Sequence, residues 1–416
     1  MTGPLVDSDP GVSVPSAPDD LERRVLDRIG IDDLVALTRA LIGQPGENPP
    51  GGEAGRARVL REACEREGLL ASLVEVEPDR PNFSAVLPGG DEPGLLVLGH
   101  TDVVPIGEGW TVDPLGGELR DGRLHGRGAT DMLGGLAAVV VAMTAIADAG
   151  VRLGGPVELS AVMDEEETGK GIRHYLLSGD RSGFAGCVVA EPTDLQTIIA
   201  ARGDSYLHTT IGGKAAHSGN PADGRNAVDG AARVIAEFGR WHDELAANAH
   251  PLVGPATVNV GLVSGGTGTS IVPAECRITT DRRLLPSETG ADALGQARER
   301  VAALDLAAKG LTCEVELTME MPGFETPADH RLVTTLDRAA AECGGPGLPL
   351  AGWTAACDGG FIARDAGVPV VVFGPGSVTD QAHQADESVG VDELLVAART
   401  YALTMLRLLG VESADR

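Results

Sequence analysis

The chain has 416 residues, of which 43% are hydrophobic and 3% aromatic, and its formal net charge at pH 7 is -28. This length suggests two or three domains, and the hydrophobic content is that of a globular protein with a core of Leu, Val and Ala. Because nucleic acids and anionic membrane surfaces are polyanions, the negative charge excludes both as expected partners.

The N-terminal segment, residues 1–20, is polar and rich in Pro and lacks the basic-then-apolar order of a signal peptide. We expect it to be a disordered tail. Six scattered cysteines without a CxxC pair predict reduced thiols and a cytoplasmic protein. The longest apolar stretch, Leu136–Ala147, is too short to span a bilayer and predicts a buried core helix.

From residue 21 to residue 201, helical and strand patterns alternate. A helix near 56–67 precedes the strand "ASLVEVE", and "NFSAVLPG" precedes "GLLVLGH". The helix at 136–147 is followed by "PVELSAVMD" and then by "GCVVAEP". Apolar strands separated by helices predict a mostly parallel sheet covered on both faces, which is an α/β fold.

The pattern changes at 202–320, where apolar and polar residues alternate in four segments: "SYLHTTIGG", "ATVNVGLV", "AECRITTDRRLL" and "LTCEVELTME". Two helical segments, "NAVDGAARVIAEFGRWHDEL" and one near 289–304, complete a two-layer α+β unit. After residue 320, a helix near 332–342 and the apolar strand "VPVVVFG" repeat the pattern of helices and apolar strands seen at 21–201. We therefore expect an α/β domain, 21–201 and 321–416, interrupted by an inserted α+β domain at 202–320.

Candidate metal ligands stand where the apolar runs end. They are His100 after "LLVLG", Glu165 and Glu166 after "VELSAVMD", Glu191 after "CVVA", His383 after "VVVFGPG", and Asp131 just before the helix at 136–147. The carboxyl ends of strands in an α/β sheet open into a crevice that collects ligands. Taken singly, Asp131 is equally a helix N-cap and "DEEE" a solvated turn. Their coincidence at strand ends favours one shared site.

Two histidines and three carboxylates suit two divalent ions of the zinc type, provided that one carboxylate bridges them. Two such ions, about 3.5–4 Å apart, polarise a carbonyl and activate a water. One of the adjacent Glu165 and Glu166 would bind metal and the other would accept the proton of that water. Asp102, two residues after His100, is expected to accept the free ring N–H of this histidine.

Six segments in order closely resemble the acetylornithine deacetylase and succinyl-diaminopimelate desuccinylase family, which includes glutamate carboxypeptidase and the aminoacylases. They are "GHTDVVP", "GRGATDMLGGLAA", "MDEEETGKG", "AEPTD", "HSGNPADGRNAV" and "FGPG…AHQADE", within a resemblance that runs from about Leu34 to Leu409. The resemblance implies a zinc-peptidase-like catalytic domain that binds two Zn²⁺ (or Co²⁺) ions. It also implies an inserted lid domain through which the protein forms a homodimer.

The same resemblance assigns the metal ligands. His100, Asp131 and Glu191 correspond to one metal site, and Asp131, Glu166 and His383 correspond to the other, with Asp131 as the bridge. It further implies a cis peptide bond directly after Asp131.

The remaining roles also follow from the resemblance. Glu165 corresponds to the general base and Asp102 to the partner of His100. His217 corresponds to a lid histidine that approaches the substrate carbonyl, often from the partner subunit. Arg283 corresponds to an arginine that binds the substrate carboxylate, a task that suits a planar guanidinium. Gly376 corresponds to a loop in which the backbone comes close to the substrate.

Several positions depart from the family pattern. The third glutamate of "DEEE" leaves open a shifted register in which Glu166 is the base and Glu167 the ligand. Ser270 stands where many relatives have asparagine, which puts a substrate contact there in doubt. Asp358, in "TAACDGG", is expected to support the site or the fold. A glutamate at position 191 goes with deacylases and some peptidases.

These features predict an amidohydrolase that removes a small acyl group from an N-acyl amino acid. The alternative is a metallo-carboxypeptidase or dipeptidase that uses the same site on a peptide bond. A catalytically silent metal-binding protein is a third reading, and Glu165, His217 and the full ligand set weigh against it.

Overall fold

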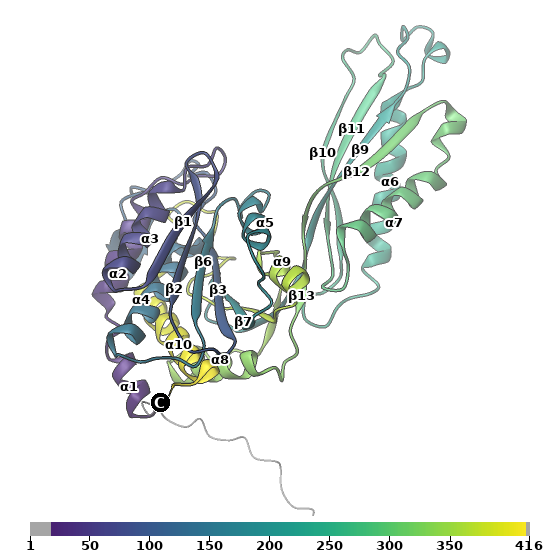
Figure 1. The fold of residues 1–416 in the computed structure, drawn as a ribbon. Helices are drawn as coiled ribbons and strands as arrows, with labels where there is room; N and C mark the ends of the chain where they lie inside the picture. The colour runs from purple at the N-terminus through teal and green to yellow at the C-terminus, as the bar shows by residue number, and fades with distance from the viewer. Residues whose placement is uncertain (1–17, 413–416) are drawn as a thin grey trace, which may run out of the picture.

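The computed structural model describes residues 18–412, which form a large α/β body and a slender lid that projects from it (Figure 1). We keep the names that the resemblance suggests, the catalytic domain for the large body and the lid for residues 204–321. Most of the predicted tail, 1–17, lies outside the described residues, whereas Asp19 caps the first helix, which begins at Asp20. An α/β sheet with a separate antiparallel α+β unit is the fold class that the sequence predicted.

The main sheet of the catalytic domain has nine strands, with the order β1-β2-β6-β3-β7-β15-β8-β13 and with β14 beside β8. Its strands are β1 (Leu70–Glu77), β2 (Arg80–Leu87), β3 (Gly94–His100), β6 (Val157–Val162), β7 (Phe184–Val189), β8 (Ile198–Ala201), β13 (Phe324–Glu325), β14 (Ala351–Trp353) and β15 (Val370–Val372). The central strands β6, β3, β7 and β15 are parallel, whereas β1 and β2 pair in antiparallel fashion. The parallel centre therefore brings several strand ends to one edge.

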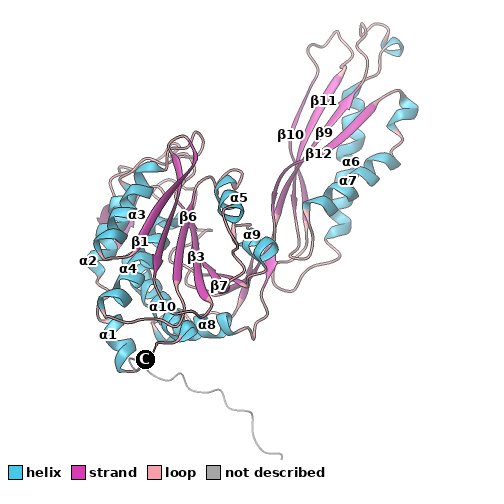
Figure 2. Ribbon diagram, viewed as in Figure 1, coloured by secondary structure: helices cyan, strands magenta, loops and turns pink. Residues whose placement is uncertain are grey.

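Helices cover both faces of this sheet (Figure 2). One core contains residues from α1 (Asp20–Leu26), α2 (Ile31–Ile42), α3 (Ala54–Arg66), α4 (Gly134–Asp148), α8 (Arg331–Glu342) and α10 (Val391–Leu409), and the other contains residues from α5 (Lys170–Leu177) and α9 (Gly359–Phe361). Along β3, Leu95 and Val97 belong to the first core and Leu96 and Leu98 to the second. Burial on both faces explains why β3 is apolar throughout.

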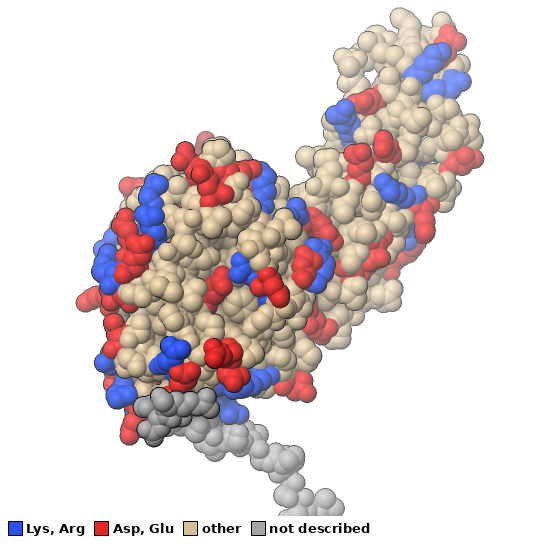
Figure 3. Space-filling view, viewed as in Figure 1, with Lys and Arg blue, Asp and Glu red and all other residues tan. Residues whose placement is uncertain are grey.

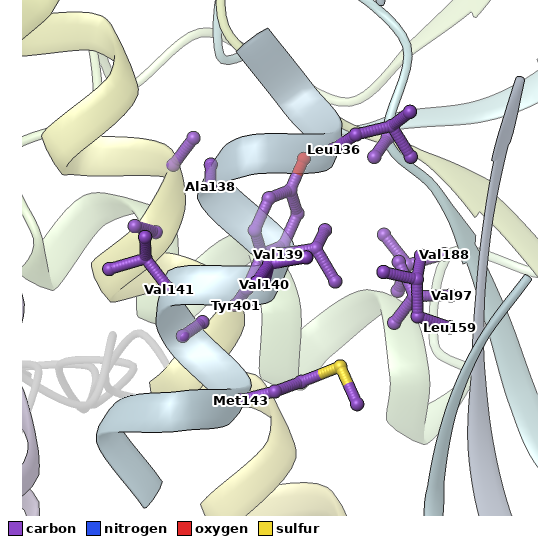
Figure 4. Packing of buried hydrophobic residues seen from close by; sticks show 14 of the residues in the cluster. Val97, Leu136, Ala138, Val139, Val140, Val141, Met143, Leu159, Val188 and Tyr401 are labelled. Atoms are coloured by element: carbon purple, nitrogen blue, oxygen red, sulfur yellow. The ribbon is translucent and has the colours of Figure 1, made fainter. Parts of the chain in front are cut away.

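Helix α4 lies between the sheet and α10 (Figure 4). Val97, Leu159 and Val188 project from the strands on one side of it, and Tyr401 of α10 packs on another. Residues 129–148 are long and apolar enough to cross a membrane, but 89% of the most apolar window is buried inside the protein. A helix that is apolar on all sides is expected at the centre of a large core, as predicted for 136–147.

The lid is a four-stranded antiparallel sheet with two helices on one face. Its elements are β9 (Asp204–Gly212), β10 (Thr257–Gly265), β11 (Glu275–Arg283), β12 (Thr312–Met321), α6 (Ala227–Leu245) and α7 (Gly290–Ala303). The helices lie on the side of the sheet away from the catalytic domain (Figure 1). The lid base is where β9 begins and β12 ends, next to the catalytic domain, and the lid tip consists of loops 213–226 and 266–274.

A third, small sheet consists of β4 (Glu118–Arg120), β5 (Arg123–His125) and β16 (Ser388–Gly390), and β16 packs against residues 129–133. On the face of the protein drawn in Figure 3, acidic and basic side chains are interspersed, and no continuous basic surface is visible there.

Candidate metal centre

The structure brings all six predicted ligand and base residues together, four from the ends of sheet strands, one from a turn and one from a loop. His100 is the last residue of β3, Glu165 and Glu166 follow β6, and Glu191 follows β7. Asp131 lies in the turn before α4, and His383 lies in the loop between β15 and β16. These side chains therefore meet beside the carboxyl ends of the parallel strands.

A close contact between α4 and the end of β7 brings Asp131 beside Glu191. A Cβ atom on Gly135 would lie 2.0 Å from the carbonyl oxygen of Ala190, so only glycine allows the helix to begin so close to this strand. The peptide bond between Asp131 and Met132 is cis, as the resemblance implied. The glycines of "MLGGLAA" thus have a direct role in the geometry of the site.

The two carboxylate oxygens of Asp131 face two different histidines. Oδ1 lies 3.2 Å from Nε2 of His100, and Oδ2 lies 3.3 Å from Nε2 of His383. Glu191 Oε1 is 3.3 Å from the same nitrogen of His100, and Glu166 Oε2 is 3.2 Å from that of His383. This arrangement gives two three-residue sets that share one aspartate, and each set could hold one ion.

The carboxylates of Glu165 and Glu166 have different neighbours in the centre. Carboxylate oxygens of Glu165 and Glu191 and a ring nitrogen of His100 lie within 4.8 Å of one another, whereas Glu166 groups with His100 and Asp131. Glu167 is exposed and belongs to neither group of described residues. Burial raises the pKa of Glu165 well above its usual range. These positions favour the unshifted register, with Glu166 as the ligand.

Asp102 holds the loop that carries both glutamates. Its carboxylate accepts hydrogen bonds from the backbone N–H groups of Glu165 and Glu166, both at 3.1 Å. Nδ1 of His100 lies 3.0 Å from the main-chain carbonyl oxygen of Asp102 but 3.6 Å from its carboxylate. The expected partner residue of His100 is therefore present, but its carbonyl is the hydrogen-bond acceptor, since 3.6 Å is too long for a hydrogen bond.

Sequence patterns did not indicate the buried network behind Asp102. The side-chain amide of Asn48 donates to Asp102 at 2.9 Å and to Asp164 at 3.0 Å. Asp164 also contacts Arg80 at 3.3 Å, and Arg80 pairs with the fully buried Glu53 at 2.6 Å. A buried network of this kind, with its members paired to one another, rigidifies its surroundings. Here it supports the turn from Asp164 into Glu165.

Gly376 and Asp358 lie at the margin of the centre. Gly376 has a φ of 86°, and a Cβ there would lie 2.7 Å from Oγ1 of Thr130, the residue before Asp131. The observed close contact of Gly376 is therefore with Thr130, in the turn that carries Asp131. Asp358 is 2% exposed, and neither of its carboxylate oxygens has a hydrogen-bond partner among residues 18–412. Burial raises the pKa of Asp358 well above its usual range.

The structure does not bring His217 to the centre within one chain. His217 is an exposed residue of the lid tip, where its Nδ1 accepts a hydrogen bond from the backbone N–H of Gly219. The nine residues of β9 separate the lid tip from the lid base by about 26 Å, at roughly 3.3 Å per residue. Ser270 lies on the other tip loop, and its carbonyl accepts from Ser218 N–H at 3.0 Å.

Arg283 lies at the lid base and is already paired. Its guanidinium makes two hydrogen bonds to Asp281, at 3.1 and 3.0 Å, and contacts Asp204 at 3.2 Å. Burial raises the pKa of Asp204 to about 7. A substrate carboxylate would therefore share this arginine with two acidic side chains of the lid.

The chemistry of the donor set fits two divalent ions. Imidazole nitrogens and carboxylate oxygens converge on two adjacent points, and both oxygens of Asp131 are used. Oε1 of Glu166 is buried without a hydrogen-bond partner among the described residues, which leaves it available to a cation. Burial raises the pKa of Glu191 to about 7, and a cation would keep this carboxylate ionised. His, Asp and Glu in this number are typical of zinc-type ions.

A sequence model of peptidase family M20/M25/M40 matches residues 96–407. Acetylornithine deacetylase of Proteus mirabilis is 30% identical over 373 residues, which cover 87% of this chain and 93% of that protein. Among solved structures, the aminopeptidase PepT of Bacillus cereus has a TM-score of 0.73 at 21% identity, covering 91% of this chain and 98% of its own.

The YXEP protein of Bacillus subtilis, described as a dinuclear metal-binding peptidase of the M20 family, has a TM-score of 0.70 at 18% identity, covering 92% of this chain and 99% of its own. At these identities the two structures show a shared fold, while the family match and the deacetylase cover most of the chain. The resemblance found from the motifs is thereby confirmed, and the chain belongs to peptidase family M20/M25/M40.

Proposed function

We propose that this metallohydrolase removes a small acyl group from an N-acyl amino acid, as the name of its acetylornithine deacetylase relatives suggests. The observation that carries the proposal is the position of Glu165, whose carboxylate lies within 4.8 Å of ligand-type atoms of His100 and Glu191, and we assign it as the base and not as a further ligand beside them. His100, Asp131 and Glu191 would hold one ion, and Asp131, Glu166 and His383 the other. Zn²⁺ is the expected metal, with Co²⁺ as a substitute.

Each residue around the centre has a separate role in the proposed hydrolysis of an amide. When bound, two divalent ions would polarise the scissile carbonyl and lower the pKa of a water. Glu165 takes a proton from the attacking water and passes it to the leaving amine nitrogen. Asp102 orients both Glu165 and the ring of His100. Arg283 binds the substrate carboxylate, and Gly376 keeps the neighbouring loop close to the site.

In the proposed homodimer, the lid of one subunit contributes His217 to the site of the other subunit. The edge strand β10 exposes Leu262 and Val263, with 69% and 53% of their surface accessible. The other edge strand, β12, exposes Glu314 and Glu316, and charged edges resist pairing with another strand. A two-fold dimer through the β10 side of the lid would bring the partner's His217 to the centre. There its ring N–H would stabilise the charge that develops on the carbonyl oxygen.

The substrate class and location complete the proposal. The substrate is a small N-acyl amino acid with a free carboxylate, and a dipeptide is the alternative because it presents the same carboxylate to Arg283. The six cysteines are free thiols, which supports a reducing, cytoplasmic location.

A substrate panel tests the proposed function directly. N-acetyl, N-succinyl and N-formyl amino acids and a set of dipeptides would be supplied to protein loaded with Zn²⁺ or Co²⁺. We expect the best N-acyl amino acid to exceed the best dipeptide in kcat/KM, with a Glu165→Gln variant as the inactive control. Preference for dipeptides would establish the peptidase alternative, and no turnover of either class would contradict both.

A further inference from the structure

A single buried carboxylate, that of Glu387, accepts hydrogen bonds from several groups of the turn that leads to Asp131. Its Oε1 accepts from the backbone N–H groups of Thr130 and Asp131, at 2.9 and 3.0 Å. Its Oε2 accepts from Gly128 N–H at 2.9 Å and from the guanidinium of Arg127 at 2.7 Å. The side chain is 1% exposed, so four donors satisfy a carboxylate that water does not reach.

Arg127 extends this contact to two further segments. Its guanidinium donates to the carbonyl of Gln384, the residue after His383, at 3.2 Å. It also donates to the carbonyl of Ile106, in the loop that follows Asp102, at 3.1 Å. Arg127 is itself 2% exposed and stacks at 5.1 Å from the ring of Trp110. The Glu387–Arg127 pair therefore links the three chain segments that carry His100, Asp131 and His383.

The backbone beside Glu387 makes the same connection. Its carbonyl accepts from Gly126 N–H at 2.9 Å, and the hydroxyl of Thr130 donates to the carbonyl of Ser388 at 2.7 Å. The strand that begins at the next residue, β16, pairs with β5, and β5 ends just before the turn that leads to Asp131. The amides of Gly126, Gly128, Thr130 and Asp131 thus all donate to Glu387, and a shift of the backbone that carries the Asp131 side chain would require several of these bonds to break.

We infer that Glu387 is a positioning residue that fixes the backbone from which the carboxylate of Asp131 projects and thereby holds the two metal positions in register. The inference rests on the proposed function, since it assigns a task within the same centre. Bonds from partners behind a ligand orient that ligand, and their loss typically lowers metal affinity about 10–100-fold. Because Asp131 belongs to both proposed ligand sets, loss of Glu387 should weaken both sites together.

The decisive variant is Glu387→Gln, which keeps the size of the side chain. One face of the amide can still accept from two backbone N–H groups, but its NH₂ must then face donors, either Gly128 and Arg127 or Thr130 and Asp131. The matched control is Glu393→Gln, because Glu393 also accepts a backbone N–H, from Gly390 at 3.1 Å, but lies half-exposed in the first turn of α10.

Metal-free protein would be titrated with Zn²⁺ and with Co²⁺ by calorimetry, and the absorption bands of the Co²⁺ form would be recorded. We expect the unaltered protein and Glu393→Gln to bind two ions with equal affinity. Glu387→Gln should bind both ions about 10–100-fold more weakly, with altered Co²⁺ bands. The thermal midpoint of each metal-free protein shows whether it is folded at the temperature of the titration.

Two results would overturn the inference. One is a folded Glu387→Gln protein that binds two ions as the control does, which would make Glu387 important for the fold alone. If Glu387→Gln does not fold, Arg127→Lys decides, because lysine keeps the charge but loses the bonds to the loops of Ile106 and Gln384. Weaker binding in folded Arg127→Lys supports the inference and unchanged binding overturns it. Failure of the unaltered protein to bind two ions would contradict the proposed function instead.

Discussion

The metal centre and the lid hold their candidate functional residues in opposite ways. In the centre, His100 is 1% exposed, and Asp102 and Asp131 are bonded to backbone amides or to side chains from distant segments. In the lid, His217 is exposed on a loop, and Arg283 is paired with acidic neighbours of the same sheet. The centre is thus tied to many parts of the chain, whereas the lid residues depend on local contacts.

This difference follows from what each region has to do. Metal ligands must be held within about 0.5 Å of a productive geometry, and rigid elements with supporting bonds achieve this. A lid residue has to approach a substrate after it has entered, which requires freedom to move. We therefore expect the effects of substitution to decrease from the centre to the lid tip and then to the lid base.

The largest effect is expected from Glu165→Gln. Loss of a general base costs on the order of 10²–10⁴ in rate, and a residue outside the ligand sets should leave two ions bound. Rate measurements and metal analysis of the purified variant test both statements. The control is Glu167→Gln, since Glu167 is the exposed neighbour. If Glu165→Gln lost an ion, Glu165 would be a ligand, and loss of an ion from Glu167→Gln would establish the shifted register.

The next effect is expected from His217→Ala, with a rate loss of about 10²–10³, as for other donors to a developing oxyanion. Because the tip is remote from its own centre, mixing inactive His217→Ala and inactive Glu165→Gln subunits should restore activity. Random exchange makes about half of the dimers mixed, with one complete site each, so about a quarter of the activity should return. No recovery after proven exchange would place His217 in its own subunit's site or outside catalysis.

A smaller effect is expected from Arg283→Lys. Lysine cannot make two parallel N–H bonds, so the substrate carboxylate should bind less well and kcat/KM should fall about tenfold. Steady-state kinetics with the best substrate of the panel measure this change. Arg277→Lys, on the same strand but near the tip, is the control and should behave as the unaltered protein. Equal efficiency of the two variants would assign Arg283 to the lid fold alone.

The smallest effect concerns the stability of the lid base and its dependence on pH. The pKa of Asp204 is raised to about 7 by burial, from an ordinary value of 3.8. Between these values the folded protein retains a proton that the unfolded chain has lost, so the contribution of Asp204 to stability decreases as the pH rises from about 4 to about 7.

Asp204→Asn should remove this dependence. Its thermal midpoint relative to the unaltered protein should rise across that pH range by about 2 °C, which corresponds to on the order of 1 kcal/mol. Scanning calorimetry at several pH values measures the difference, and Asp229→Asn, an exposed change of the same charge in the lid, is the control. A difference that does not vary with pH would contradict the raised pKa.

Much of this architecture could be predicted because it depends on local patterns. Strands such as β3 are apolar throughout when both faces are buried, and the lid strands alternate because one face is open. Most of the candidate ligand residues were recognisable because they follow apolar runs, whereas Asp131 stands just before an apolar helix. Helix α10, in contrast, was not predicted, although it packs against α4 and α8 as part of the same core.

What the sequence alone determined was the fold class, the order of its parts and the residue types at the strand ends. Tertiary structure decided how they meet, including which histidine faces which oxygen of Asp131 and which atom of Asp102 bonds to His100. It also decided the roles of Asn48 and Glu387, whose bonds to Asp164 and Asp131 span 116 and 256 positions. A buried polar side chain takes whatever partner the folded chain brings within reach, and no local periodicity records a partner so distant in the sequence.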